Sequence, residues 1–352
     1  MRGQTIGFLL GALLLRGVPA SAHEWEPPAS LRDTGLYADW ARKSVAADNL
    51  PYSPQYPLWT DGAVKARFVH VPAGSWIDAS DPDEWQFPVG TRLWKEFRFH
   101  GRRVETRYME RAADGWHYAT YAWNEDESDA PLAPERGQRS LEIKDGVRHA
   151  IPGRYDCRAC HEGRPTGVLG FTALQLSPDR DPNAVHAERP RPGDVDLRAL
   201  VARGLVRNLP AALLATPPRI AARSASERAA LGYLYGNCAM CHNPRGPLAS
   251  LGLSFDYAVG ARRDDTLSTA VGRPSQFTVP GEAPGSSQRV RPGEPDRSAL
   301  AVRLASRSAV VQMPPLGTQL VDDEAVRLVR QWIADDLGTR QASLAPRKET
   351  KR

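Results

Sequence analysis

Two copies of one five-residue pattern hold every cysteine of this chain. The copies are Cys157-Arg-Ala-Cys160-His161 and Cys238-Ala-Met-Cys241-His242. In a pattern C-x-x-C-H, the two cysteines lie about one helical turn apart, so that both thiols reach one side of a flat ring while the histidine lies under it. Each copy therefore has to fold as a helical turn, whatever surrounds it.

The pattern C-x-x-C-H is the attachment site of a c-type haem. We expect all four cysteines to form thioethers with two covalently bound haem groups, and His161 and His242 to be the proximal ligands of the two irons. Three other interpretations fit less well. Zinc-ribbon pairs lie about 15–20 residues apart, whereas residues 161–237 separate these pairs; no βαβ pattern marks a thioredoxin-like redox pair; structural disulfides leave the histidines unexplained.

The N-terminus predicts export. Arg2 gives a positive start, residues 6–15 form an apolar stretch, and Ala20-Ser21-Ala22 is typical of a signal peptidase site. The apolar stretch is shorter than the about 20 residues that span a bilayer. We therefore expect residues 1–22 to be a cleaved signal peptide and the mature protein to be periplasmic, with no transmembrane segment.

The charge balance does not indicate a nucleic-acid partner. The formal net charge is +5, but cleavage removes Arg2 and Arg16, and the ionised propionates of two haems offset most of the remainder. We expect the partners to be redox proteins of the periplasm.

The composition changes along the chain and predicts a multidomain α+β fold. Residues 23–150 are expected to form an antiparallel β domain, sandwich-like, with strands at 91–99, 103–111 and 116–123 and a hairpin at 141–149. Its tryptophans and tyrosines favour a packed core over a stacking platform for a flat ligand. A mainly α-helical dihaem cytochrome c region follows: residues 151–222 hold the first haem-binding segment, with a short helix at 195–203, and residues 223–338 form a cytochrome c-like domain. Residues 339–352 read as a disordered basic tail.

Two helices are expected in residues 223–338. Ser224 or Ser226 can cap a helix that runs into Cys238. Acidic residues 322–324 favour the start of a second helix. Its apolar stripe consists of Val326, Val329, Trp332 and Ile333.

This arrangement resembles a class I cytochrome c domain: a helix leading into C-x-x-C-H, a methionine in a proline-rich loop, and a closing amphipathic helix. The resemblance implies that Met313, in Gln-Met-Pro-Pro-Leu-Gly, is the distal ligand of the second iron. Elimination agrees, because no histidine follows His242, and Met240 lies inside the attachment pattern.

The whole mature sequence resembles a family of exported dihaem c-type cytochromes with a β-rich N-terminal domain. The resemblance rests on residues 58–63 (LWTDGA), 67–74 (RFVHVPAG) and 232–246 (GYLYGNCAMCHNPRG). It implies electron transfer and names no substrate.

The distal ligand of the first iron stays open. His186 is the nearest following candidate and His149 lies just upstream; a methionine ligand would have to be Met109. His70, His100 and His117 require the β domain to fold over the haem, and an open iron is the remaining case. A ligated first haem predicts an electron carrier rather than a stand-alone enzyme. The alternative functions are a dihaem peroxidase, which needs an open iron, and a haem-containing oxidoreductase subunit with a substrate-binding β domain.

Overall fold

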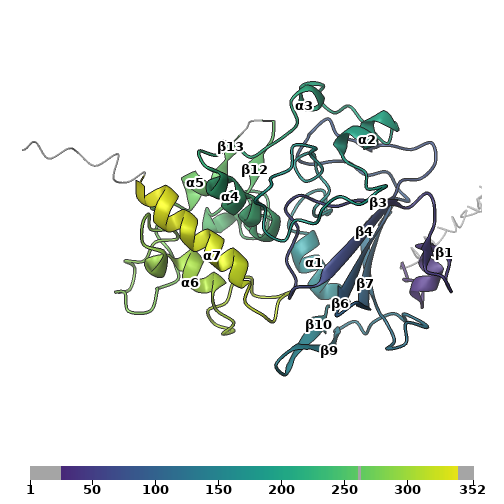
Figure 1. Cartoon of the computed structure of the whole chain (residues 1–352), viewed down its shortest axis with the longest axis horizontal. Helices are drawn as coiled ribbons and strands as arrows, with labels where there is room; N and C mark the ends of the chain where they lie inside the picture. Colours follow the sequence, from purple (N-terminus) through teal and green to yellow (C-terminus); the bar gives the residue numbers. More distant parts are fainter. Residues whose placement is uncertain (1–24, 261–262, 340–352) are drawn as a thin grey trace, which may run out of the picture.

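A five-stranded antiparallel sheet dominates the N-terminal half of the chain (Figure 1). The computed structural model describes residues 25–260 and 263–339, so the predicted signal peptide and nearly all of the predicted tail lie outside the described residues. In spatial order the strands are β3 (Leu50–Pro51), β4 (Val64–His70), β6 (Arg92–Phe99), β7 (Arg102–Ala112) and β8 (Gly115–Ala122).

Short turns set the register of the three long strands. His100 and Gly101 join β6 to β7, and both adopt left-handed backbone angles (φ 51° and 80°) that suit a two-residue hairpin. The strands predicted at 91–99, 103–111 and 116–123 are thereby confirmed in place and in antiparallel pairing.

Side chains alternate between the two faces of this sheet. On one face, Trp94, Tyr108 and Ala119 lie in register and pack with Leu31 and Leu36 from the start of the described chain. On the other face, a second row in register contacts a later part of the chain; it consists of Leu93, Met109 and Tyr118.

The predicted sandwich is wrong. In the described residues, all the remaining strands form two-stranded pairs, so no second sheet faces the large one. Helix α1 (Arg154–His161) and loops cover its second face instead, because side chains between residues 157 and 206 share a core with that face. The pairs are β1 (Tyr37–Asp39) with β2 (Ser44–Val45), β5 (Ile77–Asp78) with β11 (Val206–Arg207), β9 (Gln138–Lys144) with β10 (Val147–Ile151), and β12 (Tyr257–Ala258) with β13 (Arg263–Asp264).

The predicted mainly α-helical dihaem cytochrome c region is also wrong. From residue 151 to residue 339, leaving aside 261–262, most of the chain is loop, and only α4 (Ala225–Cys238) and α7 (Asp323–Gln331) with its continuation form helices longer than eight residues. Prolines and glycines interrupt the helical runs. The helices are α1 (Arg154–His161), α2 (Leu197–Ala202), α3 (Ala212–Ala215), α4 (Ala225–Cys238), α5 (Asp265–Thr269), α6 (Ala299–Leu304) and α7 (Asp323–Gln331), with single turns η1 (Leu31–Thr34), η2 (Ala249–Leu251) and η3 (Pro295–Arg297), and η4 (Trp332–Leu337) continuing α7.

The two helices predicted at the C-terminal end are confirmed. Ser224 caps α4 by accepting a hydrogen bond from the backbone N–H of Glu227 at 2.9 Å. Asp322 caps α7 in the same way, from Ala325 at 3.1 Å. Helices α4 and α7 pack together, and Trp332 and Ile333 are fully buried between them and their neighbours.

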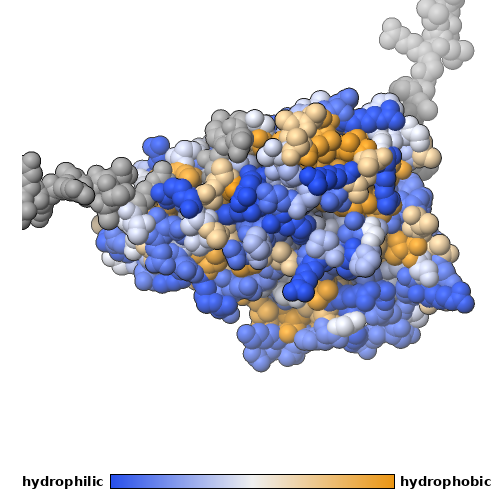
Figure 2. Space-filling view, turned by 45° about the horizontal axis from the view of Figure 1, so that its top comes forward, coloured by the Kyte–Doolittle hydropathy of each residue, from blue (hydrophilic) through white to orange (hydrophobic). Residues whose placement is uncertain are grey.

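The sheet and the C-terminal part share their packing. Tyr56, from the loop after β3, lies so close to α4 that a Cβ atom at Gly232 or Gly236 would overlap it. The space-filling view shows a largely hydrophilic face with a few hydrophobic patches (Figure 2). Within the residues that the structure describes, none of the helices has the length and apolar character needed to cross a membrane.

Candidate functional site

The first cysteine motif, residues 157–161, is the second half of helix α1. The helix begins where the carboxylate of Asp156 accepts a hydrogen bond from the backbone N–H of Gly153 at 3.0 Å. It lies on strand β8, with the sulfur of Cys157 3.9 Å from the hydroxyl of Thr120. The β-rich part of the chain therefore forms the floor beneath this motif.

His161 ends helix α1 in a defined orientation. Its Nδ1 lies 2.7 Å from the carbonyl oxygen of Gly167, and because a carbonyl only accepts, Nδ1 carries the hydrogen. The other ring nitrogen, Nε2, is left with a free lone pair. Burial lowers the pKa of His161 to about 4, so the imidazole is neutral at pH 7. This is the tautomer that a metal-ligating histidine requires.

The second motif, residues 238–242, begins at the last residue of helix α4. The backbone N–H of His242 donates to the carbonyl of Cys238 at 2.9 Å, which continues the helical turn. The ring of His242 stands edge-on to Phe255, with centroids 5.6 Å apart. Its buried Nδ1 has no hydrogen-bond partner among the described residues, so packing alone orients this ring.

The two motifs lie side by side. The thiol of Cys241 donates to the backbone carbonyl of Ala159, inside the first motif, at 3.9 Å. Its interaction with the thiol of Cys160, followed by burial, raises the pKa of Cys160. At Gly163 the two segments of the chain approach so closely that a Cβ atom would overlap the carbonyl of Met240. The side-chain amide of Asn243 donates to the carbonyl of Gly163 at 3.0 Å.

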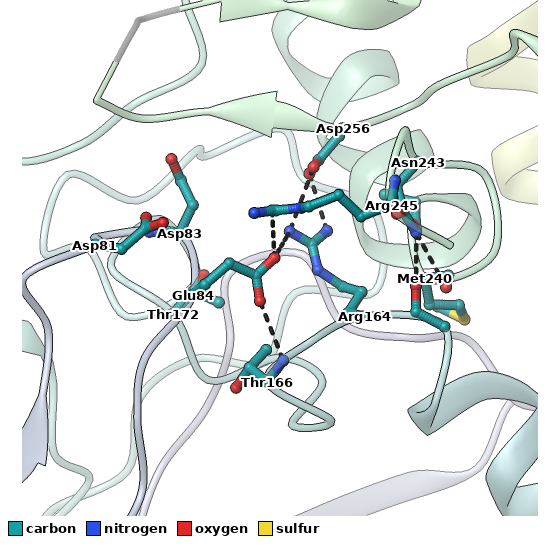
Figure 3. A network of polar contacts seen from close by, with 12 residues as sticks. Asp81, Asp83, Glu84, Arg164, Thr166, Thr172, Met240, Asn243, Arg245 and Asp256 are labelled. Atoms are coloured by element: carbon teal, nitrogen blue, oxygen red, sulfur yellow. Dashed lines mark hydrogen bonds and ion pairs between the residues drawn. The ribbon is translucent and has the colours of Figure 1, made fainter. Parts of the chain in front are cut away.

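An ion-pair network with a buried centre at Glu84 and Arg164 fixes this junction (Figure 3). Arg164, three residues after the first motif, binds Glu84 and Asp256 at 2.9 Å each. Arg245, three residues after the second motif, binds the same carboxylate of Glu84, whose other oxygen accepts from the backbone N–H of Thr166 at 3.2 Å. One carboxylate thus holds the loops behind both motifs.

Both motifs open into one cavity of about 740 Å³. This volume is within the range of cofactor pockets, about 300–1,000 Å³. The wall includes residues of both motifs, the sheet face below them and the loop from 313 to 319. Those that bear on function are Cys157, Cys160, His161, Cys238, Cys241, His242, Met109, Met240 and Met313.

A row of cations crosses the sheet beneath this cavity. Arg67 on β4, Lys95 on β6 and Arg107 on β7 are cross-strand partners in register, and all three line the cavity. Arg67 is bound to Glu188 at 3.2 Å and Arg107 to Glu105 at 2.8 Å. One buried guanidinium nitrogen of each arginine nevertheless has no hydrogen-bond partner in the described structure.

These free donors indicate an anionic group in the cavity, because a buried polar group without a partner costs about 1–3 kcal/mol. Burial, and then the charges of Arg67, Lys65 and Arg107, lower the pKa of Lys95 well below its usual value. A carboxylate bound at this row would compensate all three side chains.

Met313 reaches the cavity on a loop that is tied to the β-rich part of the chain. Its backbone N–H donates to the carbonyl of Arg303 at 3.1 Å. Farther along the loop, one carboxylate oxygen of Asp61 accepts from the backbone N–H groups of Gln319 and Leu320 at 2.7 and 2.9 Å. The structure therefore places Met313 on the wall of the cavity that both motifs line.

The histidines proposed for the first iron do not line the cavity. His186 binds the carboxylate of Asp322 at 2.9 Å, and its assignment as an iron ligand gains no support from this placement. His149 is buried against Glu105 at 3.1 Å. His70 and His117 pair with carboxylates elsewhere.

Sequence reasoning missed the cation row. Lys95 lies between Leu93 and Phe97 at two-residue spacing, which places it on a core-facing side of a strand. A lysine at such a position is the signal that could have found the row.

Two findings bear on the nature of the site. Comparison of the chain with protein-family models, curated proteins and solved structures finds no match. In residues 25–260 and 263–339, no group of three or more His, Cys, Asp and Glu side chains is placed to hold a metal ion.

Proposed function

We propose that this chain is a dihaem c-type cytochrome that transfers electrons in the periplasm. The observation that carries the proposal is the shared cavity: two C-x-x-C-H motifs, far apart in sequence, and Met313 all line it. A haem bound there would alternate between ferric and ferrous iron and so carry one electron. The polypeptide would fix the positions and set the potentials of two such groups.

The residues of the cavity fit haem groups in three respects. The thiols of each motif would form the thioethers, and His161 already presents a free Nε2 lone pair. The row of Arg67, Lys95 and Arg107 would pair with propionate carboxylates, since both arginines carry an unused buried donor and all three side chains line the cavity.

The contact between the motifs favours a relay over two independent sites. Because the thiol of Cys241 lies 3.9 Å from the carbonyl oxygen of Ala159, inside the first motif, groups attached at both motifs would be neighbours. An electron could then pass between them within the protein.

The two proximal histidines favour a direction of flow. A hydrogen bond from Nδ1 to a carbonyl makes the imidazole a stronger donor to iron and stabilises the ferric state. His161 has this bond, and His242 has none in the described structure. We infer that electrons pass from the haem at His161 to the haem at His242 and then to a periplasmic redox protein. Export with cleavage after residue 22 would supply the compartment in which haem is attached.

The test is to produce the full chain by export in a bacterium that attaches c-type haem, and to measure haem content by mass spectrometry and the pyridine haemochrome spectrum. We expect two haems per chain, one in C157A/C160A, and one in the matched variant C238A/C241A. A wild-type chain of unmodified mass would overturn the proposal. Rapid turnover of hydrogen peroxide by the reduced protein would replace the relay with a peroxidase.

A further inference from the structure

We propose that Met109, on strand β7, is the distal axial ligand of the haem attached at residues 157–161. This inference rests on the proposed function and assigns the ligand that the first iron lacks. It would make both haems His/Met-ligated, with both methionines supplied by segments remote from the motifs.

Elimination within the cavity leads to this residue. Five described methionines and histidines line the cavity: His161, His242, Met109, Met240 and Met313. Two are the histidines of the motifs, Met313 belongs to the loop beside the second motif in the predicted assignment, and Met240 lies inside the second motif. Met109 alone is left for the first iron.

The position of Met109 relative to the first motif supports the assignment. Met109 and Tyr118 are directly paired across β7 and β8, and paired side chains lie on the same face about 5 Å apart. The ring of Tyr118 lies 5.1 Å from the ring of His161. Cys157 packs in the same cluster as Met109 and Tyr118. The sulfur of Met109 is thus one strand away from His161, which would bind the iron from the opposite side.

The neighbour of Met109 on this face fits the same ligand. Arg107 lies two residues away on β7, hence on the same face, and it lines the cavity with an unused buried N–H. A porphyrin needs an axial donor to its iron and cations for its carboxylates. Strand β7 supplies both on the same face, the axial donor at Met109 and the cation at Arg107.

The competing histidines already have hydrogen-bond partners. A change of ligand to His186 would break its bond to Asp322, the residue that caps α7. A change to His149 would leave the buried carboxylate of Glu105 with one partner fewer. Met109 has no such polar contact to lose, because a thioether is only a weak acceptor.

The experiment counts methionine ligands in the holoprotein with M109L, M313L, the double variant, and M240L as the matched control. Leucine preserves volume, so the fold should tolerate each change. In the ferrous protein, each iron-bound methionine gives one set of strongly upfield-shifted methyl and methylene proton resonances. We expect two sets in wild type and M240L, one in M109L and in M313L, and none in the double variant, with two haems attached throughout.

Three outcomes would overturn the inference. Two haems with a single methionine set that persists in M109L exclude Met109 as a ligand, as does an M109L protein that keeps both sets. Conversion of one haem to high spin in H186N would assign the ligand to His186 instead. Absence of attached haem in wild type would refute the proposed function itself, and haem content separates that result from the others.

Discussion

The thiol of Cys241 interacts with the thiol of Cys160 and donates to the backbone carbonyl of Ala159 at 3.9 Å, so the two copies of one pattern meet at a single point. In the proposed holoprotein both sulfurs are consumed as thioethers. In a chain that has not received haem, the same arrangement leaves two neighbouring thiols, which the oxidising compartment reached by the proposed export would expose to oxidation.

The haem-free chain should therefore form a Cys160–Cys241 disulfide on oxidation. The expected product contains this bond and free thiols at Cys157 and Cys238, because exchange favours the pair already in contact. Alkylation followed by peptide mapping measures it. The C160A variant, in which Cys241 loses its partner, is the control. A dominant bond inside one motif, Cys157 to Cys160, would contradict the expectation.

The two haems should differ in midpoint potential. The haem at His161 should be lower by roughly 60 mV or more, a tenfold change for a one-electron couple, because only His161 donates Nδ1–H to a carbonyl. Spectroelectrochemical titration of C238A/C241A, which keeps this haem, and of its counterpart C157A/C160A gives each value separately. Equal potentials, or the reverse order, would remove the argument for the direction of electron flow.

Lys95→Met should stabilise the haem-free chain and weaken the holoprotein. Burial lowers the pKa of Lys95, so the folded chain holds this polar side chain less favourably than water does, and an apolar replacement should add about 1–3 kcal/mol to the free energy of unfolding. With haem bound, loss of a cation beside the propionates should lower a midpoint potential. Chemical denaturation of both forms measures the change in the free energy of unfolding, and a redox titration measures the change in midpoint potential. Lys144→Met, on an exposed hairpin, is the control.

The same lysine predicts a pH dependence in the haem-free chain. Burial lowers the pKa of Lys95 in the folded state, so between that value and about 10.4 only the unfolded chain holds the proton. The free energy of unfolding should then rise with pH in this range. This rise should be smaller in Lys95→Met than in wild type; identical slopes would show that Lys95 keeps its proton on folding.

Gly232→Ala should destabilise the protein although alanine favours helices. Substitution of a helical glycine by alanine ordinarily adds about 1 kcal/mol, but a Cβ atom here overlaps the ring of Tyr56. Overpacking of this kind costs about 1–3 kcal/mol. Thermal unfolding should show a lower midpoint for Gly232→Ala and near-wild-type behaviour for Gly260→Ala, whose Cβ meets only an ordinary contact. In a Tyr56→Ala background, which is itself destabilised, Gly232→Ala should lower the midpoint by less than it does in wild type.

The local elements could be predicted because their signals are local. Strands β6, β7 and β8 follow from alternating aromatic and β-branched residues, and the starts of α4 and α7 follow from Ser224 and Asp322. The covering of the sheet could not be predicted, because nothing near Trp94 or Met109 specifies whether a second sheet or helix α1 will lie on that face. The prediction of a mainly α-helical C-terminal region is wrong for a related reason. The sequence signals for α4 and α7 are correct, but prolines and glycines divide the rest of the region into loops.

The candidate site divides in the same way. Both motifs can be found in the sequence because their residue spacing is fixed. Met313 can be found by elimination, because no other methionine or histidine follows the second motif. Arg67, Lys95 and Arg107 come together only through strand register. That register depends on the pairing of β4, β6 and β7, which no single segment encodes.

The bonds from Asp61 to Gln319 and Leu320 have a consequence for the order in which the protein matures. The stretch that bears Met313 is synthesised after both motifs, and those bonds close it over the cavity. Until then both pairs of thiols face an open side. Porphyrin delivery should thus precede this final closure, and a chain that closes empty would have to open again before it could be loaded.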